Sequence, residues 1–210
     1  LSIKVQGSIK MEILKGLPVA QAINEELIKE SQEAGIKPHL AIIRVGERPD
    51  DCSYERGATK KMDKVGFDCT SYVFPQDITD EEFQKEFDKI NKDDNIDGIL
   101  LLRPLPKHIN EKAIEERINP VKDLDGISPI NLAKVYAGDV NGFAPCTAEA
   151  VIEMLDYAGI DLTGKRVTVV GRSLVIGKPV AMMLMKKNAT VTVCHTKTKD
   201  MAGTCRKAEV

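Results

Sequence analysis

Hydrophobic positions along the first hundred residues follow two different periods. Residues 13–34 carry apolar side chains at helical spacing up to Gly35, which predicts a helix that ends at a glycine. Apolar runs at residues 40–45, 70–74 and 98–102 predict strands, and residues 51–65 and 79–92 predict helices between them. Thr79 and Glu82 have the spacing of a capping box. This alternation predicts an α/β fold with a parallel, doubly wound sheet.

The second half repeats the alternation after a stretch rich in Pro, Asn and Gly at residues 119–145. We expect Thr147 to cap a helix that reaches residue 158, followed by strands at 167–170 and 189–194 with a helix between them. A last helix is expected at residues 199–207. A dinucleotide-binding domain normally has two such halves, so this Rossmann-like domain looks C-terminally truncated.

Composition narrows the class of protein. The chain has 210 residues, 42% of them hydrophobic and 30% charged, with a formal net charge of −2 and no Trp. There is neither a basic excess nor an aromatic platform for nucleic acid, and no apolar run is long enough for a membrane span. Five cysteines without close pairing and three histidines without ligand spacing predict a cytoplasmic protein with no metal site. Residues 1–10 lack a signal-peptide core and are interpreted as a cloning remnant or leader before Met11.

The strand at residues 167–170 runs directly into Gly171 and then toward a helix with Pro179 in its first turn. A helix N-terminus at the end of a strand offers backbone N–H groups and a positive dipole end to an anion. Arg172 and Ser173 add a charge and a hydroxyl, so we expect a nucleotide phosphate here. The match to known loops is incomplete, since Ser173 and Ile176 occupy the second and third glycine positions of the dinucleotide fingerprint. An ordinary turn without a ligand is the alternative.

The end of the next strand favours NADP over NAD. An NAD site usually carries an acidic residue there for the ribose 2′-hydroxyl, but residues 191–199 contain none. His195, Thr196 and a lysine follow the strand instead, a setting that tolerates a 2′-phosphate. A solvated polar strand end is the alternative.

Six short motifs together resemble the bifunctional methylenetetrahydrofolate dehydrogenase/methenyltetrahydrofolate cyclohydrolase family. In chain order they are Val45-Gly46 with Ser53-Tyr54; Asp97-Gly98-Ile99-Leu100 with Pro104-Leu105-Pro106; Pro120-Val121-Lys122-Asp123-Leu124-Asp125-Gly126; Pro145-Cys146-Thr147; Gly171-Arg172-Ser173 with Val175-Ile176-Gly177-Lys178-Pro179; and Thr190-Val191-Thr192-Val193-Cys194-His195. The resemblance implies a folate-binding catalytic domain at residues 11–145, an incomplete NADP-binding domain at 146–210, and a homodimer formed through the nucleotide domain. The family's C-terminal part is absent from this sequence.

The resemblance also implies roles for individual residues. Tyr54 would stack on the folate rings, and Asp125 would accept hydrogen bonds from the amino edge of the pterin; a surface aromatic and a turn cap are the alternatives. The other implied folate contacts are Ser53, Leu101, Leu102, Arg103 and Pro145. The implied cofactor contacts are Gly171, Arg172, Ser173, Ile176, Gly177, Pro179, His195 and Thr196, with Arg172 and Thr196 near the 2′-phosphate.

Two positions depart from the family pattern. Ala58 stands where the family has a lysine four residues after the tyrosine, and Leu102 stands where it has a glutamine. Hydride removal from a methylene between two nitrogens needs little acid–base help, whereas hydrolysis of the methenyl product needs a proton shuttle. The hypothesis is therefore an NADP-dependent dehydrogenase with weak or lost cyclohydrolase activity. Alternatives are rescue by Lys61 or Arg103 with full bifunctionality, a non-catalytic folate- or nucleotide-binding fragment, and another NAD(P) dehydrogenase.

Overall fold

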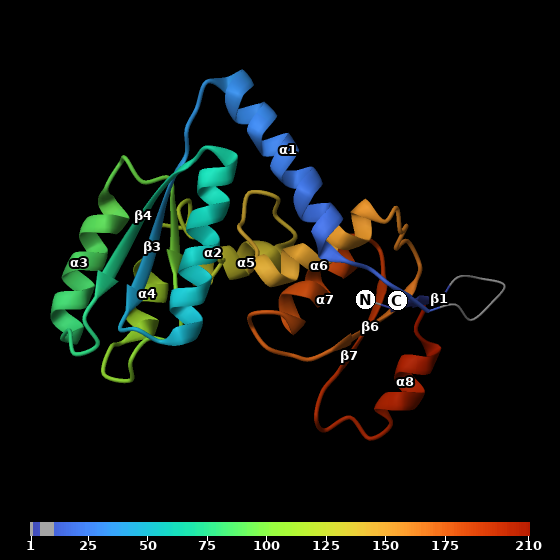
Figure 1. The fold of residues 1–210 in the computed structure, drawn as a ribbon. Coiled ribbons are helices and arrows are strands. Elements are labelled where there is room, and N and C mark those ends of the chain that lie inside the picture. The colour runs from blue at the N-terminus through green and yellow to red at the C-terminus, as the bar shows by residue number, and fades with distance from the viewer. Residues whose placement is uncertain (1, 5–10) are drawn as a thin grey trace. The chain divides into compact units, whose positions relative to one another are not determined.

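The computed structural model describes residues 2–4 and 11–210, and its contacts divide the chain into two compact units. Unit 1 comprises Leu1–Ala22 and Leu132–Val210, and unit 2 comprises Ile23–Asn131. Figure 1 shows the elements of each unit. The interpretation of residues 1–10 falls largely outside the described residues, and the domain boundaries inferred from the sequence stay a prediction.

Unit 2 is built on a parallel three-stranded sheet, as the sequence predicts. Strands β3 (His39–Val45), β4 (Asp68–Phe74) and β5 (Gly98–Leu101) lie in the order β4-β3-β5. Helix α2 (Pro49–Val65) connects β3 to β4, and α3 (Asp80–Lys92) connects β4 to β5. Gly66 ends α2 with a left-handed φ of 80°, and Thr79 and Glu82 form both bonds of the capping box. The predicted α/β sheet is confirmed.

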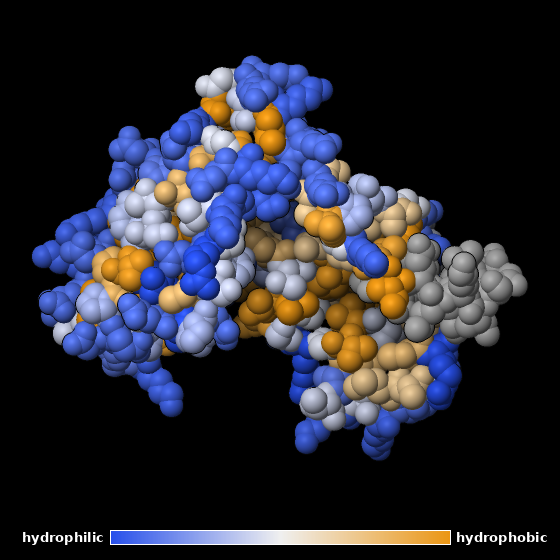
Figure 2. Space-filling model, viewed as in Figure 1, coloured by the Kyte–Doolittle hydropathy of each residue, from blue (hydrophilic) through white to orange (hydrophobic). Residues whose placement is uncertain are grey.

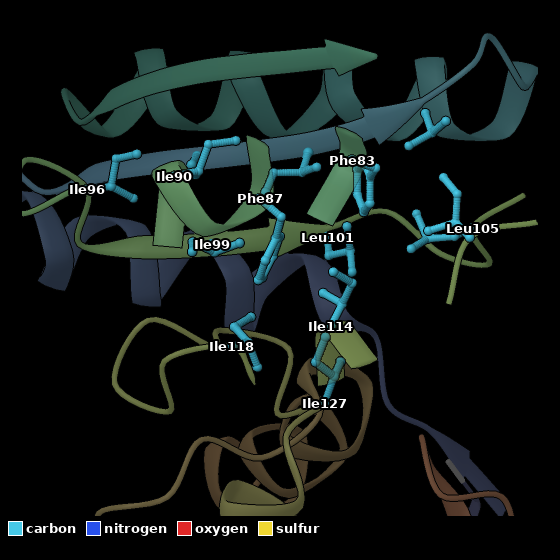
Figure 3. Packing of buried hydrophobic residues seen from close by; sticks show 14 residues of the cluster. Phe83, Phe87, Ile90, Ile96, Ile99, Leu101, Leu105, Ile114, Ile118 and Ile127 are labelled. Atoms are coloured by element: carbon cyan, nitrogen blue, oxygen red, sulfur yellow. The ribbon is translucent and has the colours of Figure 1, made fainter. Parts of the chain in front are cut away.

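Side chains alternate between two apolar layers on the faces of this sheet. Ala41, Ile43, Ile99 and Leu101 pack with α3, and Figure 3 shows Phe87 of α3 beside Ile99 and Leu101. The opposite face carries Leu40, Ile42, Leu100 and Leu102, which pack with Ala58 and Met62 of α2. Successive strand residues point to opposite faces, so α2 and α3 cover different sides of the sheet (Figure 1).

The sequence analysis missed two helices, one before and one within the stretch rich in Pro, Asn and Gly. Helix α4 (Glu111–Arg117) begins after Asn110, whose side chain accepts the N–H of Ala113 at 3.2 Å. Its Ile114 is fully buried in the same layer as α3, which places α4 on the α3 side of the sheet. Helix α5 (Pro129–Ala137) begins at a proline in unit 2 and continues into unit 1.

Unit 1 contains a second parallel pair, β6 (Arg166–Val170) and β7 (Thr190–Cys194). Helices α6 (Cys146–Tyr157), α7 (Gly177–Lys186) and α8 (Met201–Lys207) belong to it. Residues of α6, α7, β6 and β7 share one apolar cluster around Ala148, Leu155 and Leu184. The expected cap at Thr147 is wrong, because Pro145 is the N-cap and makes no side-chain cap bond, so Thr147 lies inside the first turn.

The N-terminal segment also differs from the sequence analysis. Strand β1 (Ser2–Lys4) pairs antiparallel with β2 (Met11–Ile13), and α1 (Gly16–Ala34) starts after that strand and not at Ile13. Helical periodicity assigns Ile13 to the first helix, but Ile13 is paired with Ser2 in the two-stranded sheet instead.

The two units differ in their exposed surface. Figure 2 shows hydrophobic residues gathered on the part of the view that belongs to unit 1, where Tyr136, Val140, Val170, Leu174 and Met185 are each more than half exposed. Within residues 2–4 and 11–210, no helix is both long and apolar enough to cross a bilayer.

Candidate active site

Helix α2 carries the tyrosine predicted to stack on folate. Tyr54 is 56% exposed, and the preceding Ser53 is also exposed. The next residue, Glu55, accepts a 2.6 Å hydrogen bond from Nε of Arg44 on β3, and both side chains are less than 15% exposed. Burial raises the pKa of Glu55, but hydrogen bonds from Ser71 and Arg44 outweigh it and hold that pKa below its ordinary value. The ion pair therefore stays charged, and it fixes α2 on the sheet with Tyr54 facing outward.

The two departures from the family pattern meet in one apolar layer. Ala58, one helical turn after Tyr54, packs against the buried cluster of Leu40, Ile42 and Leu102, and Leu102 is only 8% exposed. Leu102 follows β5 directly, and its backbone N–H donates to the carbonyl of Ile43 at 2.9 Å, so the position is fixed by the sheet. The layer between α2 and the sheet thus has a methyl and an isobutyl group where the resemblance implies an amine and an amide.

The two proposed substitutes for the lysine are engaged elsewhere. Nζ of Lys61 lies 3.3 Å from Oδ1 of Asn24, a side chain in α1 that is only 7% exposed. Nη1 of Arg103 donates to Oε1 of Glu115 at 2.9 Å on α4. Because α4 packs on the α3 side of the sheet, Arg103 is held away from the layer that contains Ala58.

The turn that carries Asp125 is built on a buried carboxylate. Asp123 is 1% exposed, and its two oxygens accept the N–H groups of Ile127 and Ser128 at 3.0 and 2.8 Å. The Nδ2 amide of Asn131, which is fully buried, donates to the same carboxylate at 2.9 Å. A buried carboxylate with three donors is well compensated, so this network holds the loop rigidly on either side of Asp125.

Three carboxylates surround the guanidinium of Arg103. Glu115 is hydrogen-bonded at 2.9 Å, Glu111 lies at 3.6 Å and Asp125 at 3.9 Å. Oε2 of Glu111 also accepts the backbone N–H of Leu105 at 2.8 Å, which ties the loop after β5 to α4. Burial, followed by repulsion from Glu111, raises the pKa of Glu115 against the opposing effect of Arg103. Sequence reasoning missed this cluster, although the i,i+4 spacing of Glu111 and Glu115 places both on one face of α4.

In unit 1, the loop after β6 approaches α7 very closely. A side-chain carbon at Gly177 would lie 2.2 Å from the carbonyl oxygen of Gly171 and 2.7 Å from the backbone nitrogen of Arg172. Gly171 itself has a φ of 139°, a conformation that favours glycine. The third glycine of the dinucleotide fingerprint allows the helix to pack closely on the strand, and Gly177 has that role here. It stands one residue after Ile176, which occupies the third glycine position when residues are counted.

The predicted free N–H groups at the start of α7 are already bonded. Oγ of Ser173 accepts the N–H groups of Ile176 and Gly177 at 3.1 and 3.4 Å, and the carbonyl of Ser173 accepts that of Lys178 at 3.0 Å. Pro179 has no N–H. The expectation of unused donors at this helix end is therefore wrong for this structure. A phosphate would have to exchange with Ser173 or bind the exposed side chain of Arg172.

The end of β7 forms a short polar turn beside this loop. The N–H of Gly171 donates to the carbonyl of Cys194 at 2.8 Å, which joins the ends of β6 and β7. The N–H of His195 donates to Oγ1 of Thr198 at 2.9 Å, and Nδ1 of His195 accepts the N–H of Lys197 at 3.1 Å. The exposed Thr196 lies inside this turn. The predicted cofactor residues of both strand ends are thus brought together.

The remaining predicted residues differ in accessibility. Leu101 is 3% exposed in the layer under α3, so its side chain offers little surface to a ligand. Pro145 and Pro179 are buried at the starts of α6 and α7, and Ile176 is 43% exposed. Pro145 belongs to unit 1, whereas the other predicted folate contacts belong to unit 2.

The predicted site coincides neither with a cluster of metal ligands among the described residues nor with the depression at the ends of β3 and β4. Across the described part of the chain, no group of three or more His, Cys, Asp or Glu side chains could hold a metal ion. An open depression of about 560 Å³ lies where β3 and β4 end, lined by Gly46, Glu47, Arg48 and residues 73–76, and it contains none of the predicted site residues.

Family models match both halves of the chain. The model described as tetrahydrofolate dehydrogenase/cyclohydrolase, catalytic domain, matches residues 14–125. The model described as tetrahydrofolate dehydrogenase/cyclohydrolase, NAD(P)-binding domain, matches residues 145–210.

Curated proteins and solved structures agree with these matches. The bifunctional protein FolD of Clostridioides difficile is 51% identical over 206 residues, covering 97% of this chain and 72% of the relative. A bifunctional FolD methylenetetrahydrofolate dehydrogenase/cyclohydrolase from Campylobacter jejuni is similar in structure, with a TM-score of 0.88 at 38% identity, covering 92% of this chain and 70% of that one. The corresponding enzyme from Trypanosoma brucei, solved with NADP cofactor and inhibitor, has a TM-score of 0.85 at 35% identity, covering 94% and 69%.

Proposed function

Because this chain belongs to the tetrahydrofolate dehydrogenase/cyclohydrolase family, we propose that it oxidises 5,10-methylenetetrahydrofolate to 5,10-methenyltetrahydrofolate with NADP, and that its cyclohydrolase step is weak or lost. We assign folate binding to residues 11–145 and NADP binding to residues 146–210. Assembly as a homodimer and a cytoplasmic location remain predictions, and sedimentation of the purified chain tests the first.

Dehydrogenation needs little acid–base catalysis from the protein. A nitrogen lone pair of the substrate expels the hydride from the methylene carbon, and the nicotinamide, when bound, accepts it, leaving a methenyl cation that bridges the two nitrogens. In unit 2, Tyr54 would stack on the folate ring system, and Asp125 would accept its amino-edge hydrogen bonds. These contacts hold the reacting carbon in position, which is the main contribution the step needs.

The preference for NADP rests on the end of β7 and on the loop after β6. Residues 191–199 contain no acid that would pair with a ribose 2′-hydroxyl or repel a 2′-phosphate. The exposed Arg172 supplies a positive charge to the same end of the pair of strands, and Thr196 supplies a hydroxyl. The related enzyme of Trypanosoma brucei was solved with NADP, which supports the same assignment.

The proposed loss of hydrolysis rests on one observation, the shared apolar layer of Ala58 and Leu102. Hydrolysis adds water to the methenyl carbon and returns a proton to a ring nitrogen, so it needs a group that can both release and accept a proton. Neither a methyl nor an isobutyl group can do this. The guanidinium of Arg103 is bonded to Glu115, and Nζ of Lys61 is directed to Asn24.

Full bifunctionality is the second candidate. The curated relatives are named bifunctional, and a water molecule activated by the folate itself would need no protein amine. This candidate predicts that methenyl hydrolysis matches the dehydrogenase rate in the unaltered chain.

The decisive experiment measures both steps on the same purified protein. NADP reduction with methylenetetrahydrofolate reports dehydrogenation, and the loss of methenyltetrahydrofolate absorbance above the uncatalysed rate reports hydrolysis. We expect the first and little of the second. A hydrolysis rate equal to the dehydrogenase rate would overturn the proposed loss, and absence of both reactions would overturn the proposed enzyme.

A double variant then tests the cause. Ala58→Lys with Leu102→Gln should raise hydrolysis at least about tenfold, because a positioned acid–base group contributes about 10²–10⁴-fold. Ala34→Lys, on the exposed last turn of α1, adds the same charge elsewhere, and Leu100→Gln puts the same amide elsewhere in the apolar layer. An equal gain in these control variants would contradict the assignment of positions 58 and 102.

A further inference from the structure

Arg103 is placed by α4, not by the strand that precedes it. Glu115 and Glu111 lie one turn apart on α4 and approach the guanidinium at 2.9 and 3.6 Å. The helix is itself fixed by its Asn110 cap and by the fully buried Ile114. The Arg103 side chain is only 20% exposed, and Nη1 of its guanidinium is approached by both carboxylates.

The remaining side of the guanidinium is directed to Asp125. Nη2 of Arg103 lies 3.9 Å from Oδ2 of Asp125, which is 28% exposed. That separation is too long for a hydrogen bond, so the contact between Arg103 and Asp125 is electrostatic. The backbone on both sides of Asp125 is held by the buried Asp123 network, which leaves the side chain as the adjustable part.

The charges of this cluster are unbalanced without Arg103. Glu111, Glu115 and Asp125 are gathered around a single guanidinium, with Asp123 nearby in the same turn and Lys112 acting on Glu115 from the outer face of α4. The positive guanidinium of Arg103 attracts all three carboxylates. Removing it would leave their mutual repulsion uncompensated and would take away the one positive group beside Asp125 that the structure pairs with it.

We propose that Arg103 is a positioning residue for folate, which holds the carboxylate of Asp125 toward the donor edge of the pterin while Glu115 and Glu111 anchor the guanidinium. This role rests on the proposed folate function of Asp125. It makes Arg103 a determinant of folate affinity and of the pH range of binding, and it gives Arg103 no part in proton transfer at the reacting carbon.

The test compares Arg103→Leu, Arg103→Lys and the double variant Arg103→Leu/Glu115→Gln in the full chain. Arg103→Leu should raise the KM for methylenetetrahydrofolate about tenfold, because the carboxylate of Asp125 loses its orienting partner, while kcat changes less than about twofold and the KM for NADP is unchanged. The acid limb of kcat/KM should move to higher pH. Arg103→Lys keeps the charge and should restore the pH profile, and the double variant removes the surplus carboxylate in case Arg103→Leu does not fold.

Arg117→Leu is the matched control. It breaks another arginine–carboxylate pair of unit 2, Arg117 with Asp88 at 3.2 Å, away from Asp125. We expect it to leave the folate KM and the pH profile as in the unaltered chain.

The outcomes separate the two proposals. Unchanged folate KM and pH profile in the Arg103 variants, or equal changes in Arg117→Leu, overturn the role of Arg103. Absence of turnover in the unaltered chain overturns the proposed enzyme, and folate dissociation constants of the same variants then decide the role of Arg103. Absence of folate binding in the unaltered chain overturns both proposals.

Discussion

Replacement of Gly177 by alanine tests how closely the nucleotide loop packs on its helix. The added carbon would lie 2.2 Å from the carbonyl oxygen of Gly171, 2.4 Å from its carbonyl carbon and 2.7 Å from the nitrogen of Arg172. All three are backbone atoms, so no side chain can rotate away. Ordinary contact would require α7 and the loop to separate by about 1 Å, a displacement in the range where overpacking costs about 1–3 kcal/mol.

The assay combines urea unfolding with calorimetric titration of NADP. We expect Gly177→Ala to lower the free energy of unfolding by about 2 kcal/mol and to weaken NADP binding about tenfold or more, because the displaced loop carries Arg172 and Ser173. The midpoint of thermal unfolding should fall by roughly 4–8 °C.

Gly57→Ala is the matched control for this change. Gly57 lies within α2, and a side-chain carbon there would meet no atom within 4 Å. Alanine should therefore stabilise the chain by about 0.5–1 kcal/mol, because it reduces the backbone freedom of the unfolded state. If Gly177→Ala unfolds at the same urea concentration as the unaltered chain and binds NADP equally well, the argument from close packing is refuted.

Three further changes test the scaffold of unit 2. Asp123→Asn should lower the free energy of unfolding in urea by about 2–3 kcal/mol and raise the folate KM, because an amide N–H₂ would face the backbone donors of Ile127 and Ser128. An unchanged urea midpoint would contradict the stabilising role of this hydrogen-bond network. Thr79→Ala should cost about 1 kcal/mol through loss of the capping box, again measured in urea, and a loss below a few tenths would mean that the cap is dispensable. Hydrogen bonds from Gln84 and from the N–H of Asn110 hold the pKa of Asp80 below its ordinary value. The ionised carboxylate therefore stabilises the folded chain fully above that ordinary value, and the stabilisation is lost as the pH falls through the lower pKa of the folded state. Asp80→Asn should accordingly flatten the decline of the urea midpoint below about pH 4, and an equally steep decline would remove Asp80 from the cause.

The sequence predicts the parts of the fold that local chemistry determines. Strands β3 and β5 appear as largely apolar runs because both of their faces are buried, and Gly66 and the Thr79–Glu82 pair mark helix ends by geometry that few other residues adopt. Helices α4 and α5 lack such signals. The start of α5 is fixed by Ser128 and Asn131 bonding to the buried Asp123, a contact that no pattern of hydrophobicity encodes.

The residues of the candidate site also fall into two groups, those that the sequence alone could bring together and those that it could not. Residues brought together by the ends of parallel strands, such as Gly171 and His195, could be grouped from the sequence alone, since such ends share one edge of a sheet. The ion pair of Arg103 with Glu115 could not be, because it depends on which face of β5 the unpredicted α4 covers. The fingerprint places Ile176 and not Gly177 at the third glycine position for a related reason: the fingerprint counts residues, whereas close packing depends on where the helix axis passes.

The two faces of the sheet explain why the departures at positions 58 and 102 belong together. Leu100 and Leu102 point to the α2 layer, whereas Leu101 points to the α3 layer, and Arg103 is bonded to α4 on that second side. A lysine at position 58 alone would place its stem against Leu102 with no polar partner from the strand, and a glutamine at position 102 alone would leave an amide in an apolar layer, an arrangement that costs about 1–3 kcal/mol. Each single replacement therefore loses stability without completing a proton shuttle, and the gain in hydrolysis should be strongly non-additive. This coupling between α2 and the end of β5 accounts for an alanine and a leucine occupying both positions at once.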